Sequence, residues 1–122
     1  LSLHDALPIL YREYLGVEVP NDREGCLQDS HWSGGSFGYF PSYALGNAYG
    51  AQMLRRMEQA FDVFGQVAKG DLSGVTGWLR EHVHQYGQLL EPADVVRNAC
   101  GTLDPQVYLD YLTRKYTELY AL

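Results

Sequence analysis

The sequence predicts an all-α fold. Over most of the chain the apolar residues recur three or four positions apart, which is the spacing of one helix face. No stretch longer than a few residues alternates between apolar and polar side chains, as a half-buried strand would. Capping residues, prolines and glycines stand where such helices would begin and end. These patterns together predict a chain of helices joined by short turns.

The start of the chain is unusual. Residues 1–9, LSLHDALPI, resemble the conceptual translation of a common sequencing adapter and do not fit a signal peptide. We therefore expect them to be a non-native leader and residues 10–122 to carry the native sequence. We expect Leu10 to Leu15 to form the last turns of a helix, which ends at Gly16. Residues 17–20 are expected to be extended, because a residue before proline avoids the helical region.

A short helix is predicted next. Asn21 with Glu24 three residues later is a capping-box pattern, which marks a helix start. The helix would run to about Trp32, where Ser33-Gly34-Gly35 breaks it.

The longest predicted helix begins at Pro41, which suits a first helical turn, and ends at Gly70. Its apolar residues recur at helical spacing. They are Tyr43, Leu45, Tyr49, Met53, Met57, Ala60, Phe61, Phe64 and Val67.

Three further helices complete the chain. Asp71 or Ser73 caps the first of them, and Gly87 stops it. Pro92 to Cys100 forms the second, and the third opens at Asp104-Pro105 and runs to the C-terminus. The apolar stripe of this last helix is expected to be core. It consists of Tyr108, Leu109, Leu112, Tyr116, Leu119 and Tyr120.

Composition excludes several classes of function. The 122 residues suffice for one domain, and the net charge of -6 argues against nucleic acid or an anionic membrane as a partner. No apolar run approaches the length of a membrane span. Cys26 and Cys100 match no ligand spacing, which indicates two free thiols and a reducing, cytoplasmic location.

Two histidines invite a metal interpretation. His82 and His84 are two residues apart on a predicted helix, so they lie about 200° apart around its axis. The zinc-peptidase spacing is four, with a glutamate after the first histidine. A solvated or half-buried helix histidine is therefore the better interpretation, and a metal site built from these two and His31 is the remote alternative.

The segment LQDSHWSGGSFGYFPSYALG holds the strongest candidates for chemistry. Asp29 is placed to orient the ring of His31, and glycines that follow allow close approach of backbone to a substrate. Two tyrosines, Tyr39 and Tyr43, come next in the chain. The alternative is that His31 caps a helix or satisfies the core beside Trp32.

These residues also carry a family resemblance. Residues 25–32, GCLQDSHW, match the pattern Gly-x-x-Gln-Asp-x-His-Trp, a signature motif of the carboxypeptidase Taq (M32) metallocarboxypeptidases. The chain is similar to that family onward through SGGSFGYFPSYALGNAYGAQ and WLREHVHQYG to KYTELYAL. The resemblance thus covers residues 10–122.

The resemblance implies a mainly helical, groove-shaped metallopeptidase that removes single residues from peptide C-termini and forms homodimers. Such enzymes use zinc or cobalt held by a His-Glu-x-x-His helix, and this sequence contains no such motif. We therefore expect the chain to be the C-terminal helical segment of a parent enzyme, to supply no metal ligands, and to be inactive by itself.

By analogy with related metallopeptidase folds, we further expect His31 and one tyrosine, Tyr43 ahead of Tyr39, to donate hydrogen bonds to the scissile carbonyl or to hold the substrate backbone. The remaining candidates, which would contact substrate or support the histidine, are Gly25, Gln28, Asp29, Trp32, Gly34 and Gly35. The alternative function is a non-catalytic helical protein-interaction domain, because helices that have lost their packing partners also expose apolar side chains.

Overall fold

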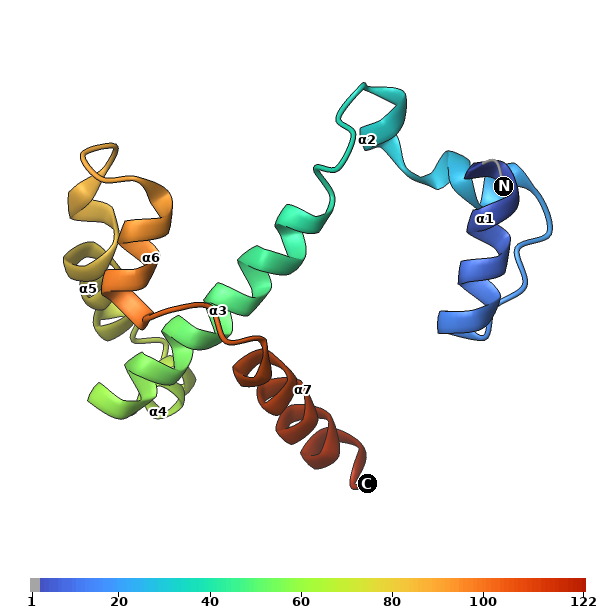
Figure 1. Ribbon diagram of the computed structural model, residues 1–122. Helices are drawn as coiled ribbons and strands as arrows, with labels where there is room; N and C mark the ends of the chain where they lie inside the picture. Colours follow the sequence, from blue (N-terminus) through green and yellow to red (C-terminus); the bar gives the residue numbers. More distant parts are fainter. Residues whose placement is uncertain (1–2) are drawn as a thin grey trace. The chain divides into compact units, whose positions relative to one another are not determined.

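The computed structural model describes residues 3–122, and every regular element in that range is a helix, which confirms the all-α prediction (Figure 1). The chain forms two compact units, Leu1–Pro41 and Ser42–Leu122. No helix within residues 3–122 is long and apolar enough to cross a membrane.

The first unit opens with α1, Leu3–Leu10, which continues into a π-helical turn, Tyr11–Leu15. Gly16 ends it in the left-handed region, at φ 65°, and its N–H donates to the carbonyl of Arg12. The predicted helix end is therefore confirmed. The expected leader, residues 1–9, begins outside the described residues, and its non-native origin stays a prediction.

The predicted helix from Asn21 to Trp32 is wrong as a single element. The chain instead makes two 3-10 turns and one four-residue helix: Asp22–Glu24, Cys26–Gln28 and α2, Ser30–Ser33. The capping interaction itself is present, since the Asn21 side chain accepts from the Glu24 N–H at 3.1 Å. Asp29 breaks the helix, because its backbone is extended and its carboxylate accepts from the His31 N–H to start α2.

Gly25 is needed between the two 3-10 turns for reasons of space. The residue is buried, and a Cβ placed there would lie 2.6 Å from Cγ1 of Val19. The branched Val19 side chain has little freedom to move aside. Val19, in the non-helical stretch 17–20, thus lies directly against the turn that precedes the histidine.

In the second unit the predicted long helix divides in two, α3, Pro41–Ala60, and α4, Val63–Ala68. The break falls at Asp62, whose carboxylate accepts from the Gly65 N–H at 2.9 Å and so caps α4. The prediction of one helix from Pro41 to Gly70 is therefore wrong. The apolar residues continue at helical spacing, but the Asp62 cap starts a new helix among them. A Cβ at residue 65 would overlap the Asp62 carboxylate, which explains the glycine there.

The next helix, α5, spans Ser73–His82 and is followed by a 3-10 turn, His84–Tyr86. Asp71 supplies the acceptor at its start, taking the Ser73 N–H at 2.9 Å. Hydrogen bonds from the Ser73 side chain and backbone hold the pKa of the Asp71 carboxyl below its ordinary value. The helix ends at His82, earlier than the predicted end at Gly87. Gly87 instead follows the 3-10 turn, at φ 51°.

The last two helices begin where the sequence predicts. They are α6, Pro92–Cys100, and α7, Pro105–Tyr120. Gly101 follows α6 at φ 89°, and the Asp104 side chain caps α7 by accepting from the Gln106 N–H at 3.0 Å. In Figure 1, α5 and α6 lie side by side, in agreement with their contacts.

The core of the second unit is built on α3, the start of α4, α6 and the start of α7. Its buried apolar residues are Ala48, Ala51, Met57, Val63, Val95, Ala99, Cys100 and Val107. Burial raises the pKa of the Cys100 thiol, an effect that the nearby Arg56 partly offsets. Both cysteines, Cys26 and Cys100, are free thiols, as predicted.

The predicted core stripe of α7 is wrong in this structure. Leu109, Tyr116, Leu119 and Tyr120 are each more than 40% exposed, and Val107 is the buried residue of the helix. The face of α7 that carries Val107 lies beside α3, whose residues line a pocket together with it.

We expect the isolated 122-residue chain to unfold over a broad range without a sharp transition. Among the described residues, no large side chain is less than 2% exposed, and many large apolar side chains are exposed. A small core gives little of the burial that makes unfolding cooperative. Thermal unfolding followed by circular dichroism measures this, and a sharp cooperative transition would contradict it.

Candidate functional site

The centre of the candidate site is a contact between Asp29 and His31. The Asp29 Oδ1 atom lies 2.7 Å from Nδ1 of His31 and also accepts the His31 backbone N–H at 3.1 Å. The two side chains are 35% and 22% exposed. The carboxylate that starts α2 therefore also holds the imidazole ring, with Nδ1 turned toward it.

Two aromatic rings lie beside this histidine. The ring centroids of Tyr39 and Phe40 lie 5.7 Å and 5.5 Å from that of His31, at interplanar angles of 36° and 59°. Phe40 is not among the predicted site residues, since its ring carries no hydrogen-bonding group. Residue spacing does not predict this contact, because it depends on the path of the loop through Gly35 and Gly38.

The loop after α2 brings these rings back to the histidine. The Ser36 N–H donates to the carbonyl of His31 at 2.7 Å, and the Tyr39 N–H donates to the carbonyl of Ser36 at 3.3 Å. Gly35 and Gly38 have φ values of 80° and 72°, which glycine adopts without the steric cost of a Cβ. The two glycines thus allow the turn that brings Tyr39 and Phe40 beside His31.

The other predicted residues are placed differently. Tyr43 stands near the start of α3, in the second unit, with 56% of its surface exposed. Gln28 donates from its side-chain amide to the carbonyl of Arg23 at 2.6 Å, so it fastens the turn before Asp29. The Gly34 N–H donates to the carbonyl of Ser30 and closes α2.

The histidines of α5 and the following turn have ordinary structural environments. His82 is half-buried and stacks on Trp78, with ring centroids 4.3 Å apart at 9°. Its Nδ1 lies 2.9 Å from the carbonyl of Trp78. His84 is exposed. Within residues 3–122, no three His, Cys, Asp or Glu side chains are grouped so as to hold a metal ion.

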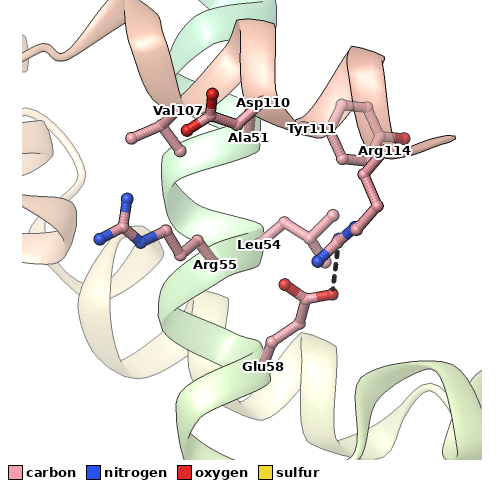
Figure 2. A pocket seen from close by; sticks show the side chains of 8 residues that line it. All are labelled: Ala51, Leu54, Arg55, Glu58, Val107, Asp110, Tyr111 and Arg114. Atoms are coloured by element: carbon pink, nitrogen blue, oxygen red, sulfur yellow. Dashed lines mark hydrogen bonds and ion pairs between the residues drawn. The ribbon is translucent and has the colours of Figure 1, made fainter. Parts of the chain in front are cut away.

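A pocket between α3 and α7 lies outside the predicted site (Figure 2). Its volume is about 280 Å³, and it is lined by Ala51, Leu54, Arg55, Glu58, Val107, Asp110, Tyr111 and Arg114. Figure 2 shows the Arg114 guanidinium turned toward Glu58, and the N–O distance is 3.3 Å. An ion pair this exposed contributes about 1 kcal/mol or less. The pocket presents no nucleophile and no group of convergent acids.

The fold and the histidine segment together define the class of protein. The family model for carboxypeptidase Taq (M32) metallopeptidases matches residues 3–116. The chain belongs to this family, which confirms the resemblance carried by residues 25–32.

Particular relatives can be named. Carboxypeptidase 1 of Bacillus subtilis is 43% identical over 114 residues, which is 92% of this chain and 23% of the relative. Thermostable carboxypeptidase 1 of Thermus thermophilus is 37% identical over 122 residues, 98% of this chain and 24% of the relative. The chain therefore spans about a quarter of the length of the curated relatives it matches.

Solved structures show the same fold. The M32 carboxypeptidase from Deinococcus radiodurans has a TM-score of 0.89 at 37% identity, over 98% of this chain and 25% of that one. A Pyrococcus furiosus carboxypeptidase structure also has a TM-score of 0.89, at 31% identity, over 94% of this chain and 24% of that one. The chain therefore has the fold of a segment of helical M32 enzymes.

Proposed function

We propose that this chain is the C-terminal part of a metal-dependent carboxypeptidase, which removes residues from the C-terminal end of peptides. Membership of the M32 family and relatives that are named carboxypeptidases support this activity. In the parent enzyme the segment would supply groups that hold the peptide and stabilise the transition state. We further propose that the parent is a cytoplasmic homodimer, for which the acidic composition and free thiols support the location alone.

The metal of the parent enzyme would be zinc or cobalt. The described residues of this chain do not fit a metal site, since they contain no group of three suitable side chains. We therefore place the metal ligands in the part of the parent that precedes the histidine motif. When bound, such a metal polarises a carbonyl and makes water acidic enough to attack it.

The observation that carries the proposal is the 2.7 Å contact between Asp29 and Nδ1 of His31. Asp29 holds the ring through Nδ1, and we propose that the opposite ring nitrogen, Nε2, contacts the peptide in the parent enzyme. As an imidazolium, His31 donates from Nε2 to the scissile carbonyl oxygen while negative charge develops there. As the neutral ring, the same nitrogen accepts a peptide N–H. In either protonation state, His31 would hold the peptide backbone beside α2.

A tyrosine hydroxyl would be the second donor. We retain Tyr43 ahead of Tyr39 for this role, by analogy with the order of residues in related peptidases. The ring of Tyr39 packs beside His31, which suits it to shape the site even where its hydroxyl does not reach the carbonyl. Gly34 and Gly35 would let the loop after α2 approach the substrate closely.

Replacing Asp29 with asparagine tests which form of His31 acts. An asparagine carbonyl still accepts the Nδ1 proton, but the negative charge beside the ring is lost. Since a charge-assisted hydrogen bond is roughly twice as strong as a neutral one, we expect kcat of the full-length enzyme to fall about tenfold with KM little changed. Steady-state kinetics measures this. Asp94→Asn removes an exposed carboxylate of α6 and is the matched control. An unchanged kcat would exclude the imidazolium role.

The assignment to a peptidase is tested by sequencing the gene upstream of Leu10. We expect an in-frame His-Glu-x-x-His helix followed by a further glutamate, the residue types that bind zinc and activate water. An open reading frame that starts near Leu10 and lacks this helix would overturn the proposal. The protein-interaction domain would then be the better interpretation.

A further inference from the structure

We propose that Gln28 is a positioning residue for His31. Its side chain fastens the turn that carries Asp29, and Asp29 in turn holds the histidine ring. Gln28 is thereby assigned to one of its two expected roles, support of the histidine instead of contact with the substrate. The inference rests on the proposed carboxypeptidase function and names a residue on which the proposed action of His31 depends.

The side chain of Gln28 links the two 3-10 turns that precede Asp29. Its Nε2 atom donates to the carbonyl of Arg23, five residues earlier, at 2.6 Å. Arg23 belongs to the first turn, Asp22–Glu24, and Gln28 is the last residue of the second, Cys26–Gln28. Backbone carbonyls at the end of a helix lack a partner within it, and the amide of Gln28 supplies one. The end of one turn is therefore tied to the end of the next.

This side-chain bond matters because the backbone holds Asp29 only weakly. The Gln28 N–H donates to the carbonyl of Gly25 at 3.0 Å, but the Asp29 N–H reaches the carbonyl of Cys26 at 3.4 Å, which is long for such a bond. Beyond residue 28 the chain leaves the 3-10 turn, since Asp29 has φ -86° and ψ 116°. The amide of Gln28 thus adds a second attachment at the residue directly before Asp29.

The other end of the turn is packed in place. Gly25 is buried, and a Cβ there would lie 2.6 Å from Cγ1 of Val19, so the turn has no room to shift toward that side chain. With Val19 against Gly25 and the Gln28 amide on Arg23, the turn is held at both of its ends.

Asp29 transmits this position to the histidine. A single carboxylate oxygen, Oδ1, lies 2.7 Å from Nδ1 of His31 and accepts the His31 backbone N–H at 3.1 Å. A shift of the Asp29 backbone therefore disturbs the ring and the start of α2 together. Small misplacements of a group that acts on a substrate are costly in rate. Every contact in this sequence of interactions lies within residues 19–31, so none requires a free surface on the histidine.

The experiment is a double-mutant cycle in the full-length enzyme. Gln28→Glu keeps the length of the side chain but removes its donor, and we expect kcat to fall about fivefold, the usual net effect of one hydrogen bond, with KM little changed. When His31 is already alanine, Gln28→Glu should lower kcat no further, because two residues that act through one interaction are not additive. Gln106→Glu is the matched control. It removes the amide that donates to Asp110 within α7, at 2.7 Å, and should leave kcat unchanged.

Hydrogen exchange gives a readout besides activity. The His31 N–H donates to Asp29, so we expect it to exchange faster in Gln28→Glu than in the unmodified enzyme, and to be unaffected by Gln106→Glu.

Three results would overturn the inference. An equal loss of kcat with and without His31 would show that Gln28 contacts the substrate or only supports the fold. An unchanged kcat in Gln28→Glu would exclude a positioning role, and so would unchanged exchange of the His31 amide. Failure of the proposed function gives a different result, because the unmodified enzyme would then hydrolyse no peptide, or His31→Ala alone would turn over normally.

Discussion

Replacing His31 with alanine in the full-length enzyme should lower kcat by about a hundredfold to a thousandfold while the metal content stays unchanged. This is the usual cost of removing one donor aimed at a developing oxyanion. His31 is suited to that role because the contact between Asp29 and Nδ1 holds its ring in one orientation. Steady-state kinetics, with metal analysis of the purified protein, measures both quantities.

The control for this variant is His84→Ala, which removes an exposed histidine of the second unit. It should leave kcat unchanged. Normal turnover in His31→Ala would eliminate the proposed role. Loss of the metal together with activity would also contradict it, because His31 would then support the metal site and not the carbonyl oxygen.

The helix ends that local chemistry decides were predictable from the sequence. Asp104 caps α7 with its own side chain, and Gly101 leaves α6 with a positive φ, both as expected. These interactions span only a few residues, so the sequence contains all of their determinants. The same holds for the pair Asp29 and His31, whose spacing of two residues lets one carboxylate reach both the backbone and the ring.

Features that depend on competition between local patterns were not predictable in the same way. Phe61 and Phe64 continue the apolar period of α3, yet the Asp62 cap ends that helix and starts another. The apolar period is compatible with both arrangements, because residues three apart can share one face of a continuous helix or flank a break. The capping hydrogen bond decides between them.

Features that depend on packing partners were also missed. The α7 residues Tyr116 and Leu119 have the periodicity of core residues, but they are 41% and 63% exposed. Phe40 was missed for a related reason. Its contact with His31 depends on the path of the loop through Gly35 and Gly38, which residue spacing does not give.

The largest effect on stability is expected for Gln52→Leu. Gln52 is buried, and its amide nitrogen donates to the carbonyls of Thr102, at 3.0 Å, and Cys100, at 3.4 Å. Its amide oxygen accepts the N–H of Asp104 at 2.8 Å. One side chain on α3 thus satisfies the backbone of the connection that joins α6 to α7.

A leucine at position 52 fills a similar volume but leaves these backbone groups without their partners. Since each buried polar group left unsatisfied costs about 1–3 kcal/mol, we expect a loss of about 2–4 kcal/mol, concentrated at residues 100–104. Hydrogen exchange of the full-length enzyme measures the local loss at the amide of Asp104. Gln66→Leu is the matched control, because Oε1 of Gln66 is buried without a hydrogen-bond partner among the described residues. Removing an acceptor that already lacks a donor should cost little, so equal destabilisation by the two variants would show that volume, and not the hydrogen bonds of Gln52, stabilises the connection.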